Sequence, residues 1–271
     1  MNGETLYFFQ GSEHRRDVPA ASKRRAWAIL MPSPFPHREH EHLTNPPLTQ
    51  VLFQINFSPI FKITKEEPSE FQERIRERFS KTQLLDPASQ SIPMSFVGSK
   101  AYRFQTSDDK HAITLAAEYC AISSRRYDGW KSFWRDLNLM HSTLKEVYEP
   151  AALTRIGIRY INALTPDNTK SENMNDLMEL LSADLKPLFR AGMRINSTES
   201  FVQLGVPDDG ATLVLRLAAR PSQQILLVDL DCYEQRDLAL DEVPDWASKR
   251  HEFIYDAFRW CLSDESLRFF Q

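Results

Sequence analysis

The sequence predicts an α+β protein in which one unit, made of a strand, a helix, three strands and a second helix, occurs twice in tandem. Apolar residues fall at alternate positions in the proposed strands and at every third or fourth position in the proposed helices. The order of these segments in the first half of the chain then returns in the second half. Two such units side by side would form a continuous antiparallel sheet with the helices on one face.

The first unit begins with a strand over residues 49–61, where Val51, Phe53 and Ile55 alternate with more polar residues. Its helices are predicted from the 3.6-residue spacing of aromatic and aliphatic side chains, such as Trp130, Phe133 and Leu137. The other segments expected in this unit are a helix from residue 68, strands at 94–97, 101–106 and 112–122, a turn at 107–110 and a helix at 128–148.

The second unit repeats this order. Its predicted segments are a strand at 153–164, a helix at 172–185, strands at 201–206, 212–219 and 224–233, a turn at 208–210 and a helix at 244–262. The matched positions are Leu52 with Ile156, Pro68 with Glu172, Ile113 with Ile225 and Trp130 with Trp246, at separations of 104 to 116 residues. Because the separations grow slowly, small loop insertions would account for them.

The predicted organisation is a mobile tail over residues 1–44, a first repeat over 45–150 and a second over 151–271, the two repeats packed as one domain. Six of the sixteen prolines lie in residues 1–47, and the charges there follow no helical or strand period. Residues 4–12 resemble a viral protease recognition site with one extra phenylalanine, so whether the first twelve residues are native stays open. The tail also carries three histidines of metal-ligand type, which we interpret as solvated because nothing in the sequence orders them: His37, His40 and His42.

Composition excludes several classes of protein. The eight glycines form no nucleotide-binding loop and no nucleophile elbow, and the longest apolar run has six residues, too short to cross a bilayer. Nucleic-acid binding is not expected, because the net charge is −4 and no basic stripe is present. The three cysteines form no C-x-x-C motif and fit a reducing compartment, so we expect a cytoplasmic protein without a membrane, metal or cofactor requirement.

Three short motifs carry a resemblance to a known family. They are Asn45-Pro46-Pro47-Leu48 before the first strand, Arg155-Ile156-Gly157-Ile158-Arg159-Tyr160-Ile161-Asn162 at mid-chain, and His251-x-x-Ile254-x-x-x-Phe258 in the closing helix. In these motifs the chain resembles a sporadically distributed bacterial family of proteins of similar length with no assigned function. The resemblance covers residues 45 to 265 and implies a cytoplasmic bacterial protein without an established activity or cofactor.

The mid-chain motif supplies the candidate ligand-binding residues. Strand alternation places Arg155 and Arg159 on one face and Tyr160 and Asn162 on the other. If residues 112–122 form one strand, Glu118 lies on the face that the matching strand of the second half fills with leucine, and it needs a cationic partner. Arg159 is the expected partner, either as part of a ligand site in the groove between the repeats or as a structural ion pair.

Our leading hypothesis is a non-enzymatic binding or regulatory protein that uses this groove for a small molecule or a protein partner. One alternative is a small-molecule enzyme with Glu118, Arg159 and a histidine, His141 or His251, in acid–base roles. Both histidines lie among apolar helix residues, which favours hydrogen-bonded core positions. Another alternative is an antitoxin-like or defence-system subunit. A homodimer, the identity of the ligand and the existence of any reaction stay open.

Overall fold

A computed structural model describes residues 33–41, 43–85, 100–187, 200–208 and 210–271. Its centre is a nine-stranded sheet in the order β2-β3-β4-β5-β1-β6-β9-β8-β7, in which all neighbours pair antiparallel. The strands are β1 (Leu48–Phe57), β2 (Lys81–Leu85), β3 (Ala101–Gln105), β4 (His111–Ala116), β5 (Tyr119–Ser124), β6 (Leu153–Leu164), β7 (Ser200–Asp208), β8 (Ala211–Arg220) and β9 (Ile225–Glu234). The α+β class and the continuous antiparallel sheet are therefore confirmed.

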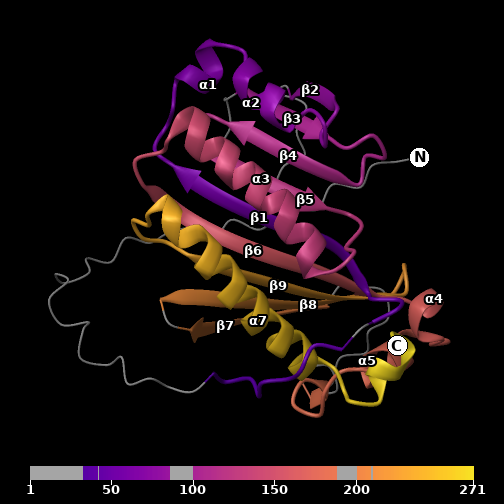
Figure 1. Ribbon diagram of the computed structural model, residues 1–271. Coiled ribbons are helices and arrows are strands. Elements are labelled where there is room, and N and C mark those ends of the chain that lie inside the picture. Colours follow the sequence, from indigo (N-terminus) through magenta and orange to yellow (C-terminus); the bar gives the residue numbers. More distant parts are fainter. Residues whose placement is uncertain (1–32, 42, 86–99, 188–199, 209) are drawn as a thin grey trace, which may run out of the picture.

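Two long helices, α3 (Trp130–Tyr148) and α7 (Val243–Cys261), lie side by side across one face of the sheet (Figure 1). The shorter helices are α1 (Lys62–Lys65), α2 (Ser69–Ile75), α4 (Pro166–Thr169) and α5 (Met174–Glu179), with 3-10 turns η3 (Leu240–Glu242) and η4 (Ser266–Phe269). Among the described residues, no helix is long and apolar enough to cross a lipid bilayer.

The main core lies between the sheet and these helices. On β1, the alternate residues Val51, Phe53 and Ile55 are completely buried, whereas the residues between them point to the other face, hereafter the open face. Phe53 contacts Trp246 of α7 edge-on, with ring centroids 6.4 Å apart. The strand alternation expected from the sequence therefore decides which side of the sheet the helices cover.

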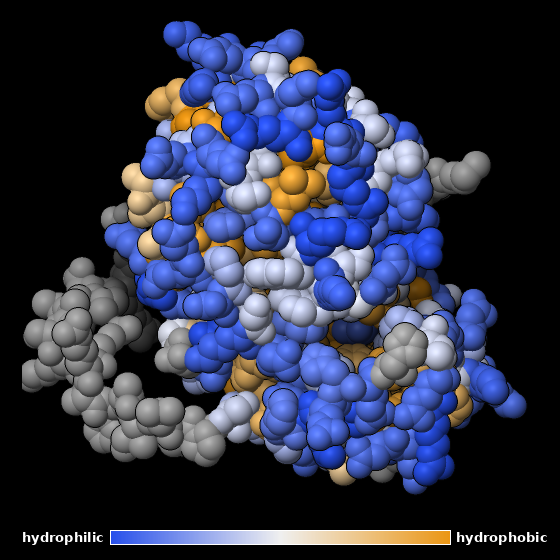
Figure 2. Space-filling model, in the orientation of Figure 1, coloured by the Kyte–Doolittle hydropathy of each residue, from blue (hydrophilic) through white to orange (hydrophobic). Residues whose placement is uncertain are grey.

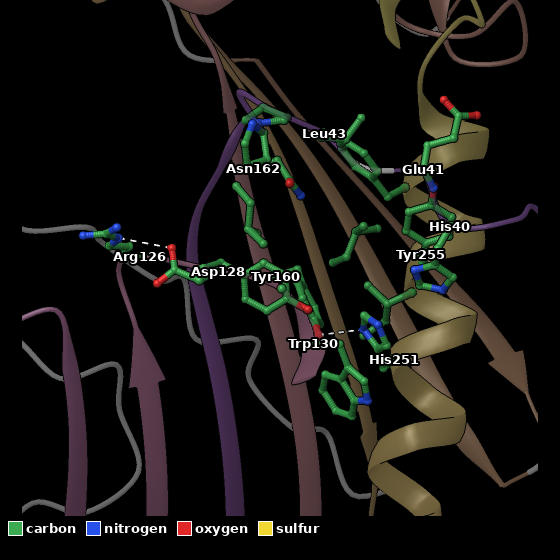
Figure 3. Close-up of a pocket in the computed structure, with 18 of the residues that line it drawn as sticks. His40, Glu41, Leu43, Arg126, Asp128, Trp130, Tyr160, Asn162, His251 and Tyr255 are labelled. Atoms are coloured by element: carbon green, nitrogen blue, oxygen red, sulfur yellow. Dashed lines mark hydrogen bonds and ion pairs between the residues drawn. The ribbon is translucent and has the colours of Figure 1, made fainter. Parts of the chain in front are cut away.

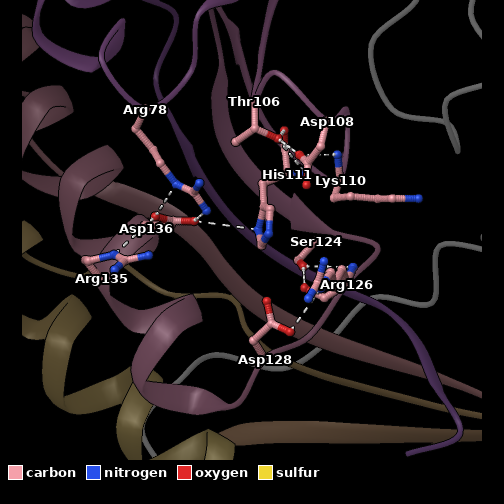
Figure 4. Close-up of polar contacts among 10 residues, drawn as sticks. All are labelled: Arg78, Thr106, Asp108, Lys110, His111, Ser124, Arg126, Asp128, Arg135 and Asp136. Atoms are coloured by element: carbon pink, nitrogen blue, oxygen red, sulfur yellow. Dashed lines mark hydrogen bonds and ion pairs between the residues drawn. The ribbon is translucent and has the colours of Figure 1, made fainter.

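A buried carboxylate ties α3 to its surroundings (Figure 4). Asp136 of α3 is 1% exposed and accepts two hydrogen bonds from Arg78, at 2.9 and 3.1 Å. His111 of β4 lies on the other side, its Nδ1 3.6 Å from the same carboxylate. Since Arg78 follows α2, this cluster fixes α2 and β4 against α3.

The predicted strand over residues 112–122 is in fact two strands. Ala117 and Glu118 form a two-residue turn between β4 and β5, where Ala116 pairs with Tyr119. Backbone amides of Phe57 and Ile60 donate to the carbonyls of Glu118 and Ala117, at 3.0 and 2.8 Å. The turn lacks the Asn-Gly or Asp-Gly dipeptide that usually announces a hairpin, and its stabilising contacts come from β1 and the segment after it.

Other segments also differ from expectation. The sequence pattern does not predict β2, and the expected strand at 94–97 lies outside the described residues. The helix expected over 172–185 is shorter, because α5 ends at Glu179 and Leu181 pairs with Leu262 in an isolated bridge. Four described strands, not three, thus lie between α2 and α3, and the matched residues Ile113 and Ile225 lie in strands that do not correspond by sheet order.

Candidate functional site

A pocket of about 760 Å³ opens on the helix-covered face, between the sheet, the two long helices and the N-terminal segment (Figures 2 and 3). We call residues 33–41 and 43–47 the N-terminal strap. The lining residues come from four places: His40, Glu41, Leu43, Thr44, Pro46, Pro47 and Leu48 at the strap and the start of β1, Arg126 to Trp130 before and at the start of α3, Tyr160, Asn162 and Leu230 on the sheet, and His251, Ile254, Tyr255 and Phe258 on α7. Most of these side chains are apolar or aromatic, as in sites for small organic molecules.

Local sequence features aim these side chains at the pocket. On β6, Tyr160 and Asn162 are two residues apart and therefore share the helix-covered face. On α7, His251, Ile254 and Tyr255 are three and four residues apart and form one stripe. Before α3, Gly129 has φ +92°, a conformation open to glycine, and this turn places Trp130 at the first position of the helix.

His251 occupies the centre of an aromatic cluster. Its ring stacks on Trp130, with centroids 4.1 Å apart and planes 8° apart, and its Nδ1 is 2.9 Å from the Tyr160 hydroxyl oxygen. Tyr127 packs edge-on against the Tyr160 ring. Burial, and then the nearby charge of His40, lower the pKa of His251 to about 3. The imidazole is therefore neutral at physiological pH, as expected for a core histidine.

Polar groups converge on the same pocket. Asn162 is 4% exposed, and its Nδ2 donates to the Val228 carbonyl oxygen at 3.1 Å, which fixes the orientation of the amide. At the opposite end, Arg126 donates to the Asp128 carboxylate at 3.1 Å. The Glu41 carboxylate accepts hydrogen bonds from the side chains of Gln271, at 2.7 Å, and Arg259, at 2.8 Å. The bond from Gln271, followed by the bond from Arg259 and its charge, lowers the pKa of Glu41.

The N-terminal strap closes one wall of the pocket by lying along α7. Phe35 is 4% exposed between Phe253 and Trp260, with ring centroids 5.4 and 5.3 Å away. The Arg38 amide donates to Asp256 at 2.8 Å, and His40 Nε2 lies 2.8 Å from a carboxylate oxygen of Glu252. Residues 33–41, which belong to the tail predicted over residues 1–44, thus contact α7, while residues 1–32 and 42 lie outside the described part of the chain.

The structure separates the predicted site residues. Tyr160 and Asn162 line the pocket, whereas Arg155 and Arg159 lie on the open face of β6. The Arg155 guanidinium is 4.9 Å from the centroid of the Tyr233 ring. A Cβ at Gly157 would come within 3.0 Å of this guanidinium, so the glycine of the motif leaves room for the arginine to cross the strand.

The predicted pair between Glu118 and Arg159 does not form. Arg159 donates two hydrogen bonds to Asp229, at 2.6 and 2.7 Å, and Arg216 lies 3.4 Å from the same carboxylate. Glu118 is in the β4–β5 turn, beside the end of β1, while Arg159 pairs with Leu52 near its start. Asn56 of β1 pairs with Tyr119, the residue after Glu118, whereas Leu52 pairs with Arg159. Because Leu52 and Asn56 are four residues apart, Glu118 and Arg159 are separated by roughly 13 Å along β1.

The acid–base set considered from the sequence is not assembled either. His251 lies on the helix-covered side of the sheet, and Arg159 on the open side. His141 is buried on α3, and its Nε2 donates to the Leu240 carbonyl oxygen at 2.9 Å. The three cysteines are completely buried, and burial raises the pKa of each thiol. The interpretation of both histidines as hydrogen-bonded core residues is confirmed.

Sequence reasoning did not identify Trp130, His40, Tyr255 or Tyr127 as members of a site. The helical spacing predicts a packing role for Trp130, and the irregular pattern of residues 1–44 places His40 in the tail. Two sequence motifs could have indicated this pocket: Asn45-Pro46-Pro47-Leu48 and the closing motif with His251, Ile254 and Phe258. Residues of both motifs line the pocket. Comparison with protein-family models and with curated proteins finds no match to this chain.

Proposed function

We propose that the protein is a non-enzymatic binding protein whose ligand is a small, largely apolar organic molecule held between the two halves of the chain. The observation that carries this proposal is the pocket of about 760 Å³, walled by aromatic and aliphatic side chains around a few convergent polar groups. Its members come from both halves and from the strap, so a ligand there would contact all three.

The polar groups indicate the chemistry of the ligand. Asn162 uses its amide nitrogen on Val228, so its carbonyl oxygen is left to accept a hydrogen bond from the ligand. Trp130, Tyr127 and Tyr255 offer ring surfaces for an aromatic or alicyclic body. We therefore expect a molecule with an apolar ring system and at least one hydrogen-bond donor.

Two features favour binding over acid–base catalysis. His251, the buried histidine of the pocket, is neutral and already bonded through Nδ1 to Tyr160. The enzyme alternative also depended on Glu118 and Arg159, which contribute nothing to the pocket lining. A proton-transfer role needs a group within hydrogen-bond reach of the substrate and with a pKa near the working pH.

The internal duplication and the resemblance to the sporadically distributed bacterial family belong to this proposal. The duplication is supported by sheet order: outward from the centre, one half runs β1-β5-β4-β3 and the other β6-β9-β8-β7. Superposing residues 48–150 on 151–262 tests it, and a mismatch of α3 with α7 in that superposition would refute it. In this view the ligand groove is the seam between the two copies.

The binding proposal is tested with the full chain. Purified protein is incubated with a small-molecule extract of bacterial cells and passed through a desalting column, and the retained compounds are identified by mass spectrometry. We expect wild-type protein to retain a compound unchanged, and Leu43→Trp, which fills the pocket from the partly buried strap, to lose it. Arg155→Ala, on the open face, is the matched control and should retain it.

Retention by Leu43→Trp equal to that of wild type would contradict the pocket as the site. Retention of nothing by wild type would contradict small-molecule binding and leave the protein-partner alternatives. Recovery of a chemically altered compound would support the enzyme alternative instead.

A further inference from the structure

Two histidines and a glutamate meet where the N-terminal strap crosses α7. His40 comes from the strap, and His251 and Glu252 are consecutive residues of α7. One potential ligand atom from each lies within 4.8 Å of the other two. The His40 and Glu252 side chains are exposed and His251 is buried, so the cluster extends from the core to the surface.

The contacts of His251 leave one ring nitrogen for the cluster. Nδ1 is engaged with the Tyr160 hydroxyl at 2.9 Å, and the stack on Trp130 fixes the plane of the ring. When Nδ1–H donates to the Tyr160 oxygen, Nε2 carries the lone pair that a metal ion would bind. A hydrogen bond from the second nitrogen is the usual support for a metal-ligating histidine.

His40 is also held in place. Its ring stacks on Tyr255 at 3.9 Å between centroids, and its Nε2 lies 2.8 Å from a Glu252 carboxylate oxygen. Ligand atoms bound about 2.1 Å from a tetrahedral Zn²⁺ ion are about 3.4 Å apart. A small outward movement of the two exposed side chains, His40 and Glu252, would therefore admit an ion.

We propose that His40, His251 and Glu252 form a binding site for a divalent transition-metal ion of the Zn²⁺ type. Two imidazoles and one carboxylate are a ligand set found for zinc in sites that keep a coordination position open. Because His40 and His251 line the pocket, the open position would border it. The ion would also fasten the strap to α7, through one of the three histidines that the sequence analysis interprets as solvated.

The proposal does not depend on the small-molecule function, since metal binding is measured without any organic ligand. Full-length protein is freed of metal with a chelator, exchanged into chelator-free buffer and titrated with Zn²⁺ by calorimetry. A parallel titration with Co²⁺ follows the visible absorption bands, whose intensity reports tetrahedral coordination. We expect one ion per chain and a rise in melting temperature on addition of Zn²⁺.

Variants of His40 and Glu252 test metal binding without disturbing the fold, because both side chains are exposed. His40→Ala and Glu252→Gln should each weaken Zn²⁺ binding at least tenfold, and His251→Gln should abolish it. The matched control is His37→Ala, on the same strap, where the histidine pairs with Asp256 at 3.3 Å outside the cluster. This control should change the affinity less than threefold.

Failure of wild-type protein to bind Zn²⁺ and Co²⁺ would overturn the proposal. So would binding that His40→Ala and Glu252→Gln both leave unchanged, or binding that only His37→Ala weakens. If the wild-type protein binds no metal but retains an organic compound from the extract, only the metal site is overturned. If it binds metal but retains no organic compound, only the small-molecule binding function is overturned.

Discussion

At the residue scale, the open face of the sheet is organised around one carboxylate. Asp229 of β9 accepts one hydrogen bond from Nε and one from Nη2 of Arg159, on the neighbouring strand β6. Arg216 of β8 lies 3.4 Å from the same carboxylate. The side chains of these three residues are between 10 and 20% exposed, so the charges are only partly solvated. Such a cluster stabilises less through attraction than the loss of Asp229 would destabilise, because both arginines would lose this carboxylate and only Asp231, 3.6 Å from Arg216, would still face them among these carboxylates.

Asp229→Ala is therefore expected to lower the free energy of unfolding by about 2–3 kcal/mol. Glu118→Ala is the matched control: it removes a half-buried turn carboxylate that has no ion-pair partner among the described residues, and should change stability by less than about 0.5 kcal/mol. Urea denaturation of both variants measures these values. A larger loss for Glu118→Ala than for Asp229→Ala would contradict Asp229 as the main partner of Arg159.

A second residue-scale feature is the buried His141. Burial lowers its pKa from 6.5, and the hydrogen bond to the Leu240 carbonyl opposes this only in part. The unfolded chain takes up a proton below about pH 6.5, whereas the folded state does not until its own lower pKa is reached. Stability from this group is thus complete above about pH 6.5 and is lost as the pH falls.

His141→Gln should make stability less dependent on acid pH, since glutamine can donate to Leu240 and does not titrate. Below pH 6.5 this one histidine contributes a slope of at most about 1.4 kcal/mol per pH unit, so the variant curve should be shallower by up to that amount. Denaturant unfolding at pH 7.5, 6.5 and 5.5 (about one unit apart, to bracket the unfolded pKa) compares the two proteins. Parallel curves would show that His141 is protonated equally in both states.

At the scale of elements, the N-terminal strap behaves as part of the core although it contains no helix or strand over residues 33–41. Phe35 inserts between two aromatic residues of α7, and the strap hydrogen bonds run along the same helix at Asp256 and Glu252. The Asn45 amide donates to the Phe270 carbonyl oxygen at 3.1 Å, which links the strap to the end of the chain. The strap therefore both stabilises α7 and forms part of the pocket wall.

Phe35→Ala should lower the free energy of unfolding by about 3 kcal/mol, the lower end of the range for a buried aromatic residue. Phe61→Ala is a matched control with the same chemical change, because Phe61 is 74% exposed. Thermal or urea unfolding measures both. Equal, small effects of the two substitutions would show that the strap is not packed in solution and would support the prediction of a mobile tail.

At the scale of the whole molecule, the sheet is continuous through the β1–β6 pair. Nine residue pairs join these strands, with register shifts near both ends of β1. The outermost strands are β2 and β7, and β2 has exposed residues along most of its length. The central strands β1 and β6 are therefore hydrogen-bonded to a neighbouring strand on both sides, whereas β2 is hydrogen-bonded to a strand on one side only.

Hydrogen exchange followed by mass spectrometry should reflect this order. Amides of β1 and β6 should exchange last, by global unfolding, and those of β2 should exchange by local opening. Fast exchange at the β1–β6 pair would indicate that the two halves separate, which would make the seam a hinge. Protection of β2 as strong as that of β1 would mean that its outer edge is covered in solution.

The sequence by itself determined the features that depend on near neighbours. Alternation placed Arg155 and Arg159 opposite Tyr160 on one strand, and the 3.6-residue period located both long helices to within a few residues. Residues two, three or four apart share a face because of backbone geometry alone, so no partner needs to be known. The antiparallel α+β class followed from the order of these elements.

The tertiary structure alone decided which side chains meet. The turn at Glu118 depends on backbone bonds to β1, the partner of Arg159 is 70 residues away, and His40 reaches Glu252 across 212 residues. At such separations many carboxylates compete as partners for each cation, and the strand register selects among them. The pocket has the same origin, because Tyr160, Trp130 and His251 become neighbours only when the strap, the sheet and both long helices pack together.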